Sequence, residues 1–225
     1  MNYINKIKNE NPVIFKMLFN TMNNNKLSHA VIFSAQRGTP THNESHFLAQ
    51  ALINEKSFSK NVVRNIETYP DFHIINGKES LIKKNQVIEI ITKLKETPLE
   101  QNGKKILLIN NIENSNKESF NSLLKFLEEP TKDTYIIMTT NNISKVIATI
   151  KSRSQVINLK TKSSKEINRV LKENNIDEKY SKILSSFVDS AKHGIKEMEN
   201  LKIVYEKILE ALVLVLAIEI KLFFA

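Results

Sequence analysis

The chain of 225 residues contains no cysteine. This absence excludes disulfides, thiolate zinc sites and cysteine nucleophiles together. The N-terminus also lacks a positively charged segment followed by an apolar core, so we expect no secretory signal and a cytoplasmic location. The most apolar stretch, residues 208–225, is interrupted by Glu210, Glu219 and Lys221, which makes it a poor transmembrane candidate. We therefore expect no contact with a membrane.

The remaining composition is that of a soluble globular protein, with 41% hydrophobic and 25% charged residues. The net charge of +9 comes mainly from residues 1–160, which carry 22 Lys+Arg against 14 Asp+Glu, whereas residues 161–225 carry 11 against 10. A basic half can contact nucleic acid or an acidic partner. Because no run of Lys and Arg contains interleaved aromatic residues, we favour a solvated lysine-rich surface over a nucleic-acid groove.

The clearest pattern in the middle of the chain predicts a parallel βαβ unit. Residues 106–109 and 135–140 are short apolar runs typical of strands buried on both faces. Between them, the spacing of Ser115 and Glu118 predicts a capping box at the start of a helix, which Pro130 ends. The apolar face of this helix consists of Phe120, Leu123, Leu124 and Leu127. In such a unit, ligands gather at the carboxyl ends of the strands.

Further patterns extend this α/β organisation. Pro12 fits the first position of a helix entered from Asn11. Short strands are expected at residues 31–33 and 72–75. The other helices expected before residue 151 cover about residues 45–53, 87–94 and 144–150.

Three short motifs follow one another in this region, namely residues 121–130 (NSLLKFLEEP), Thr139-Thr140-Asn141 and Ser152-Arg153-Ser154. In this order and spacing they closely resemble the AAA+ clamp-loader subunits of bacterial DNA polymerase III. In that family the second motif ends a sensor strand, which makes Thr140 and Asn141 sensor-like, and the third is a Ser-Arg-Cys motif. The resemblance covers about residues 10–200. It implies an α/β fold, an AAA+ P-loop-type parallel sheet flanked by helices and followed by a small helical lid domain.

The segment at the position of the phosphate-binding loop lacks the residues that hold nucleotide. A working P-loop reads Gly-x-x-x-x-Gly-Lys-Ser/Thr, so that backbone N–H groups and the lysine bind phosphate while the hydroxyl holds magnesium. In this register Gly38 lies inside the loop, while the four functional positions hold Ala35, Pro40, Thr41 and His42. Pro40 also removes an N–H donor. We therefore expect no nucleotide to bind here.

The second half of an ATPase site is also missing. The strand at residues 106–109 should lead into Asp-Glu, one carboxylate for magnesium and one to polarise the attacking water. It leads instead into Asn110 and Asn111, which cannot act as a general base and bind a hard cation poorly. We therefore expect no cofactor and no metal, and no enzymatic activity of the chain by itself. Polymerase activity would belong to the DNA polymerase III holoenzyme, a DNA-directed DNA polymerase.

His42 and His46 are four residues apart and could share a helix face. Their order is not the His-Glu-x-x-His of zinc proteases, and no third ligand is evident among the other histidines. We therefore interpret both as polar residues at the start of a helix.

Many clamp-loader relatives carry a four-cysteine zinc module where this chain has residues 54–70, which contain no cysteine.

The C-terminal third is expected to be helical. Ser163 and Glu166 have the spacing of another capping box, ahead of expected helices at about residues 164–173, 177–191 and from 195 onward. The resemblance then implies three parts: an AAA+ core with a degenerate P-loop (residues 1–160), a helical lid (residues 161–201) and the start of a truncated or minimal collar (residues 202–225).

Within the family, the chain is most similar to the delta-prime type of subunit, which keeps the AAA+ fold and the Ser-Arg motif without a working P-loop. The resemblance implies a non-ATPase subunit that helps to load the sliding clamp on primed DNA. Its partners would be clamp-loader ATPase subunits and a delta-type subunit in a hetero-pentamer. Arg153, flanked by Ser152 and Ser154, would act in trans on a neighbour's nucleotide from the carboxyl edge of the sheet.

Two alternatives remain open at this point. The chain could be a gamma- or tau-like clamp-loader ATPase subunit with a divergent P-loop, which an ATP-binding assay would reveal. It could also be a basic DNA-binding module that uses residues 1–160, and binding by the monomer would then depend steeply on salt.

Overall fold

The computed structural model describes residues 2–36, 41–54, 64–100, 103–159, 164–178, 180–182, 198–200 and 203. The chain divides into two compact units, Met1–Lys160 and Thr161–Ala225. Within the ranges just given, no helix is long and apolar enough to cross a membrane.

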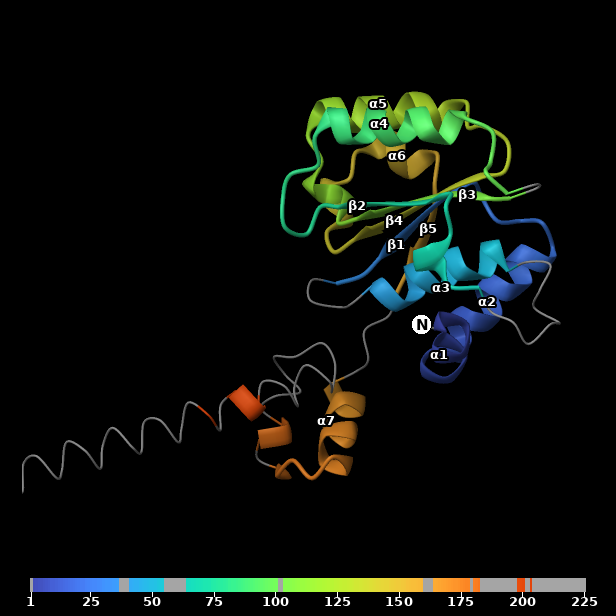
Figure 1. The fold of residues 1–225 in the computed structure, drawn as a ribbon. Coiled ribbons are helices and arrows are strands. Elements are labelled where there is room, and N and C mark those ends of the chain that lie inside the picture. Colours follow the sequence, from blue (N-terminus) through green and yellow to red (C-terminus); the bar gives the residue numbers. More distant parts are fainter. Residues whose placement is uncertain are drawn as a thin grey trace, which may run out of the picture. The chain divides into compact units, whose positions relative to one another are not determined.

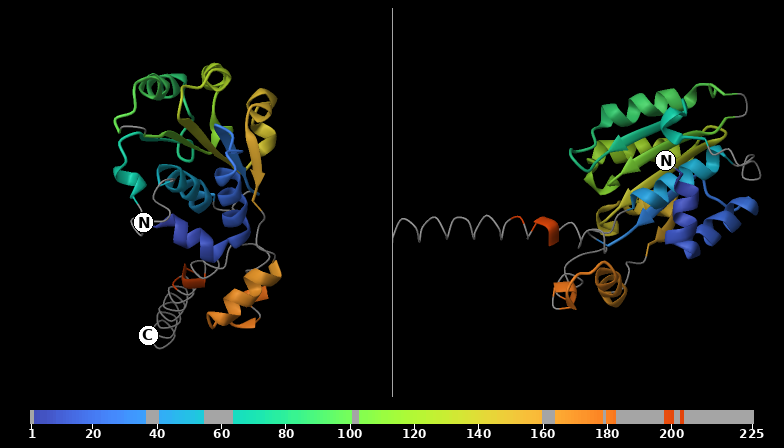
Figure 2. Two further views of the ribbon diagram at one scale, coloured as in Figure 1. Left: turned by 90° about the vertical axis from the view of Figure 1, so that its right-hand side faces the viewer. Right: turned by 60° about the horizontal axis from the view of Figure 1, so that its bottom comes forward.

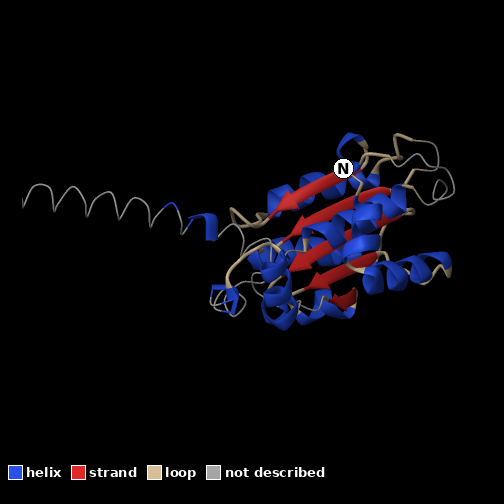
Figure 3. Cartoon of the chain, turned by 90° about the horizontal axis from the view of Figure 1, so that it is seen from below, coloured by secondary structure: helices blue, strands red, loops and turns tan. Residues whose placement is uncertain are grey.

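The first unit is built on a five-stranded sheet in which every neighbouring pair of strands is parallel (Figure 3). In spatial order the strands are β2 (Phe72–Asn76), β3 (Lys105–Asn110), β4 (Thr134–Thr140), β1 (Ala30–Ser34) and β5 (Gln155–Asn158). The three central strands are buried along nearly their whole length, as expected for a parallel sheet covered on both faces. The strands predicted at residues 31–33, 72–75, 106–109 and 135–140 are confirmed.

Helices cover both faces of this sheet (Figures 1 and 2). One face carries α1 (Tyr3–Glu10), α2 (Pro12–Asn23) and α3 (His42–Ile53), and the other carries α4 (Lys84–Lys95), α5 (Lys117–Glu128) and α6 (Ala148–Ser152). Each layer of helices packs its apolar residues against the strands in a separate buried cluster. The short turns η1 (Ile66–Thr68), η2 (Ile112–Asn114) and η3 (Ile143–Lys145) complete the unit. The predicted α/β architecture with a flanked parallel sheet is confirmed.

In the second unit, α7 (Ser164–Glu173) confirms the helix expected at residues 164–173. Ser163 lies outside the described residues, as do most of the residues expected in the rest of the lid and all but one of those expected in the collar.

The start and the buried face of α5 differ from the prediction. The helix is capped by Asn116, whose Oδ1 accepts hydrogen bonds from the Ser119 backbone N–H (2.8 Å) and hydroxyl (2.7 Å). The capping box at Ser115 is therefore wrong, because Ser115 already closes the preceding turn through its N–H bond to Ile112. Leu124 is only partly buried, at the flank of the face, while Phe126 is 3% exposed and belongs to the core.

The single short helix predicted for residues 144–150 is instead two pieces, η3 and α6. Val146 and Ile147 separate them in extended backbone conformation (ψ 127° and 145°). Two consecutive β-branched residues favour this conformation over a continuous helix.

Lys105 is a buried cation at the start of β3, only 4% exposed. Its Nζ donates hydrogen bonds to the carbonyl oxygens of Leu94 and Glu96 (2.9 Å for the latter) and to the hydroxyl of Thr131 (3.2 Å). The last carbonyls of a helix have no partner inside the helix. Lys105 therefore satisfies the C-terminal end of α4 and fastens it to the sheet.

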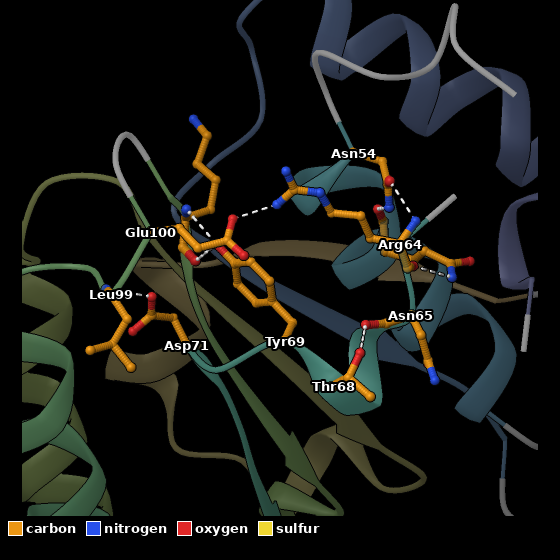
Figure 4. Close-up of polar contacts among 10 residues, drawn as sticks. Asn54, Arg64, Asn65, Thr68, Tyr69, Asp71, Leu99 and Glu100 are labelled. Atoms are coloured by element: carbon orange, nitrogen blue, oxygen red, sulfur yellow. Dashed lines mark hydrogen bonds and ion pairs between the residues drawn. The ribbon is translucent and has the colours of Figure 1, made fainter. Parts of the chain in front are cut away.

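Hydrogen bonds connect the end of α3 to the segment that leads into β2 (Figure 4). Asn54 Oδ1 accepts from the Arg64 backbone N–H (2.9 Å), and the Arg64 guanidinium pairs with Glu100. The Tyr69 hydroxyl donates to the Lys104 carbonyl oxygen (2.9 Å) and accepts from the Lys104 N–H (3.0 Å). At the position of the relatives' zinc module, hydrogen bonds rather than thiolate ligands thus connect Asn54 to Arg64.

Candidate functional site

The degenerate P-loop segment begins after β1, at the carboxyl edge of the sheet. Ala35 is 7% exposed, and its N–H donates to the Thr140 carbonyl oxygen (3.0 Å). Thr41 precedes the first residue of α3, and its side chain makes no capping hydrogen bond. Gly38 and Pro40 lie outside the described residues. The two described positions thus supply a buried methyl group and an uncharged hydroxyl where a P-loop has a glycine and a lysine.

His42 lies in the first turn of α3 and is in contact with α1. Its Nε2 is 3.1 Å from the Tyr3 hydroxyl, and its ring centroid is 3.7 Å from that of His46. Gln50 Oε1 accepts hydrogen bonds from the backbone N–H groups of Tyr3 (2.7 Å) and Ile4 (3.2 Å) at the start of α1. Helix α1 is therefore fixed across α3, beside the position of the missing P-loop hydroxyl. Helix α3 also begins three residues before the predicted position 45 and includes both histidines.

Burial favours the uncharged form of both histidines. The pKa of His46 is lowered to about 4, mainly by burial and then by the nearby His42, although its bond to the His42 carbonyl opposes this. Burial also lowers the pKa of His42, with Lys6 acting in the same direction and Glu67 against it. These neutral rings offer no positive charge to a phosphate.

A carboxylate already occupies the first turn of α3. The N-terminus of a helix favours anions and is the usual place for a bound phosphate. Glu44 stands in this turn; its burial raises its carboxyl pKa, while a backbone hydrogen bond and a side-chain bond with Asn11 lower it. In its ionised form Glu44 repels a phosphate from the helix end.

Asn110 and Asn111, in place of the magnesium-binding acids, bond to their own chain. Asn111 follows β3 in the left-handed conformation (φ 51°), and its N–H donates to the Thr139 hydroxyl oxygen (3.1 Å). The Thr139 hydroxyl is 3.5 Å from Asn110 Oδ1. The Asn111 side-chain amide donates to Glu113 Oε1 (3.4 Å). The two amides are thus held in place without supplying a carboxylate for a metal or a water.

Glu113 connects this turn to the end of β4. Its Oε1 accepts the backbone N–H of Asn141 (2.9 Å), and its Oε2 is buried without a hydrogen-bond partner in the described part of the chain. The hydroxyl of Thr140, which is fully buried, accepts the N–H of Asn142 (3.1 Å). Among the sensor-strand residues, Thr139 is therefore the one whose hydroxyl contacts Asn110 and Asn111. Neither Thr139 nor Glu113 was among the predicted site residues.

Arg153 lies at the amino edge of the sheet, opposite to the degenerate P-loop. It follows α6 and precedes β5, whose Gln155 pairs with Val31 near the start of β1. Gln155 Oε1 also accepts the N–H of Ser28, which precedes β1 (3.4 Å). The prediction that Arg153 lies near the carboxyl edge is wrong. The chain must return across the sheet before it can add another parallel strand, and α6 makes that return.

The Arg153 side chain is 37% exposed, and its guanidinium contacts three acceptors of its own chain. Its Nη2 donates to Glu128 Oε1 at the end of α5 (2.8 Å). Its Nη1 donates to the Thr149 carbonyl oxygen (3.2 Å) and to the Ser152 hydroxyl (3.5 Å). The Ser154 hydroxyl donates to the Ile150 carbonyl oxygen (2.8 Å), which fixes the turn that carries Arg153.

The two edges are separated by the height of the sheet. Strand β4 has 7 residues, which corresponds to about 20 Å at roughly 3.3 Å per residue. Arg153 therefore does not reach the P-loop position of its own sheet. Throughout the described ranges, no three His, Asp or Glu residues gather as potential metal ligands.

This fold has a counterpart among solved structures. The chain is similar to the RuvB Holliday junction branch migration motor of Thermotoga maritima, with a TM-score of 0.50 and 16% sequence identity over 78% of this chain and 55% of that one. At this identity the likeness concerns the fold alone.

Sequence comparison identifies the family. A profile described as "DNA polymerase III, delta subunit" matches residues 10–163. The chain is 28% identical over 196 residues to DNA polymerase III subunit delta' of Bacillus subtilis, covering 84% of this chain and 59% of that protein. It is 30% identical over 156 residues to the delta' subunit of Haemophilus influenzae, covering 65% and 47%. The chain thus spans about half the length of these curated relatives. It belongs to the DNA polymerase III delta-prime family, the family of clamp-loader subunits that its motifs resemble.

Proposed function

We propose that this chain is a clamp-loader subunit that hydrolyses no ATP itself and supplies Arg153 in trans to a neighbouring ATPase subunit. The observation that carries the proposal is the placement of two features on opposite edges of one sheet. At the carboxyl edge, Ala35 and Thr41 stand at the positions of the first P-loop glycine and of its lysine, and the acid Glu44 lies in the first turn of α3. An arginine side chain that is 37% exposed lies at the amino edge, where its own chain has no nucleotide to serve.

The proposed chemistry of Arg153 is electrostatic. An arginine supplied by a neighbour stabilises the negative charge that develops on a transferred phosphoryl group, and in GTPases this is worth roughly 10³–10⁵ in rate. Ser152 and Ser154 support the turn, because their hydroxyls donate to the carbonyl oxygens of Thr149 (3.1 Å) and Ile150 (2.8 Å). Serine at position 154, where the family commonly has cysteine, keeps the hydrogen-bond donor.

The proposed partners follow from family membership. They are clamp-loader ATPase subunits and a delta-type subunit in a hetero-pentamer that places the sliding clamp on primed DNA during replication. The chain would contact the clamp and the DNA as part of that complex, in the cytoplasm.

The test is a clamp loader reconstituted with Arg153→Ala. We expect an assembled complex whose DNA- and clamp-stimulated ATP turnover falls, by a smaller factor than in GTPases because this chain completes one of several sites. Lys125→Ala, which removes an exposed cation from α5, is the matched control and should leave turnover unchanged. Wild-type turnover and clamp loading with Arg153→Ala would rule out the trans role.

A further inference from the structure

The partner that Arg153 contacts most closely is Glu128, and the motif that contains Glu128 has no role in the function proposed so far. The Nη2–Oε1 distance is 2.8 Å, and the two side chains are 37% and 51% exposed. Glu128 is the last residue of α5, followed by Glu129 and by Pro130, which cannot continue the helix. The ion pair therefore connects the end of α5 to the turn between α6 and β5.

Local preferences disfavour an acid at the position of Glu128. The C-terminus of a helix carries partial negative charge and favours Lys, Arg or His. Glu128 is nevertheless placed there, and Arg153 brings a compensating positive charge. Residues that break a local rule in this way are often retained for function.

The geometry of the pair leaves part of the guanidinium available. Arginine has five N–H donors, and Arg153 uses one Nη2–H on Glu128 and its Nη1 group on Thr149 and Ser152. The Nε–H and the second Nη2–H have no partner in the described part of the chain. A phosphate that approaches Arg153 bidentately would need an Nη2 donor beside the carboxylate, and the two anions would then repel each other.

We infer that Glu128 is a positioning residue, which holds the Arg153 guanidinium against α5 and competes with the neighbour's phosphate for it. This inference rests on the proposed function of Arg153. Glu128 itself would touch neither nucleotide nor metal, and would act only through the arginine. Glu128 thereby determines how readily the Arg153 guanidinium exchanges its contact with Glu128 for one with the nucleotide of the adjacent subunit.

The expected size of the effect follows from exposure. Ion pairs between exposed side chains are weak, and the equilibrium constant for holding Arg153 on Glu128 is on the order of one to four. Removing the carboxylate charge should therefore raise stimulated ATP turnover by about two- to fivefold at limiting ATP. A larger gain would require a buried pair, which this one is not.

The experiment measures kcat/KM for stimulated ATP hydrolysis by the reconstituted complex that contains Glu128→Gln. This variant keeps the size and an acceptor oxygen and removes the charge. The matched control is Glu129→Gln, the next residue, which is exposed and makes no ion pair within the described ranges. Both variants are repeated with Arg153→Ala. We expect a gain of about two- to fivefold for Glu128→Gln alone and no gain when Arg153 is absent.

The outcomes separate the two ideas. If Arg153→Ala leaves turnover unchanged, the proposed trans function fails, and this inference fails with it. If Arg153→Ala lowers turnover while Glu128→Gln changes nothing, only the role of Glu128 is overturned. A lower turnover with Glu128→Gln would mean that the carboxylate supports the arginine, which also overturns competition. A gain that persists in the Arg153→Ala background would show that Glu128 acts on helix α5 itself.

Discussion

The carboxyl and amino edges of the same sheet have opposite character. At the carboxyl edge, described polar side chains bond to one another, as Tyr3 does with His42 and Asn111 does with Glu113. At the amino edge, the Arg153 side chain is 37% exposed and is held by an exposed ion pair.

Under the proposed function, the carboxyl edge no longer binds nucleotide, while the amino edge keeps an arginine for a partner. At the carboxyl edge, Tyr3 of α1 contacts His42 in the first turn of α3. Under the proposed function, the arginine at the amino edge serves a different molecule and does not depend on nucleotide binding by its own chain. Stability should therefore depend on the first edge and activity of the assembly on the second.

The largest effect should come from Arg153→Lys at the amino edge. An ammonium lacks the planar fork that meets two phosphate oxygens, so lysine should restore little of the turnover lost in Arg153→Ala. We expect turnover in the reconstituted complex to remain close to that of Arg153→Ala. Asn110→Ala, at the opposite edge, should change turnover little. Full activity with lysine would mean that charge alone is sufficient.

The next effect concerns the stability of the contact between α1 and α3. Gln50→Leu keeps the bulk but removes the acceptor of two backbone N–H groups at the start of α1. Buried donors left without a partner cost about 1–3 kcal/mol. Urea denaturation of the isolated chain should report a loss of this size, whereas Glu128→Gln at the exposed edge should stay within about 1 kcal/mol. Equal losses in the two variants would contradict this expectation.

A smaller effect should appear in the pH dependence of stability. The pKa of His46 is about 4 in the folded chain and about 6.5 in an unfolded one. Between these values the unfolded chain binds a proton that the folded chain does not, so stability should fall as pH decreases from about 6.5 to about 4.

The measurement is the denaturation midpoint of wild type and His46→Gln across this pH range. The variant should be less stable at pH 7 but should lose less on acidification. Parallel curves would show that His46 titrates in the folded chain as it does in the unfolded one.

The smallest effect should follow from partial repair of the P-loop. Pro40→Gly with Thr41→Lys restores two of the lost residues, but Glu44 still repels phosphate, and Asn110 and Asn111 still supply no carboxylate. We expect calorimetry to detect no magnesium-dependent ATP binding by wild type or by this variant. Tight binding by wild type would instead support the ATPase alternative.

The sequence was sufficient for most of the fold because each element carries a local signal. Apolar runs marked four of the five strands, and Pro130 marked the end of α5. The contact between Tyr3 and Gln50 had no such signal, because it joins residues 47 positions apart. Glu113 could have been predicted as a site residue, because it is the first acidic residue after β3, where an ATPase would have Asp-Glu.

The wrong edge for Arg153 came from one unrecognised element. Residues 155–158 were not identified as a strand, although Val156 and Ile157 are β-branched. Had β5 been recognised, the rule that parallel strands start at the same edge would have placed Arg153 correctly. The ion pair with Glu128 could not have been predicted, because it depends on how α6 packs against α5.

Lys105 gives the first unit an internal chemical reporter. Its amine is enclosed by the end of α4 and the hydroxyl of Thr131, whereas Lys93 and Lys95 on that helix are exposed. An amine-reactive reagent at low dose should label the exposed lysines within minutes and reach Lys105 only when α4 leaves the sheet. The labelling rate at this one residue, read by mass spectrometry, would therefore measure how often the unit opens, in the isolated chain and in any assembly that it joins.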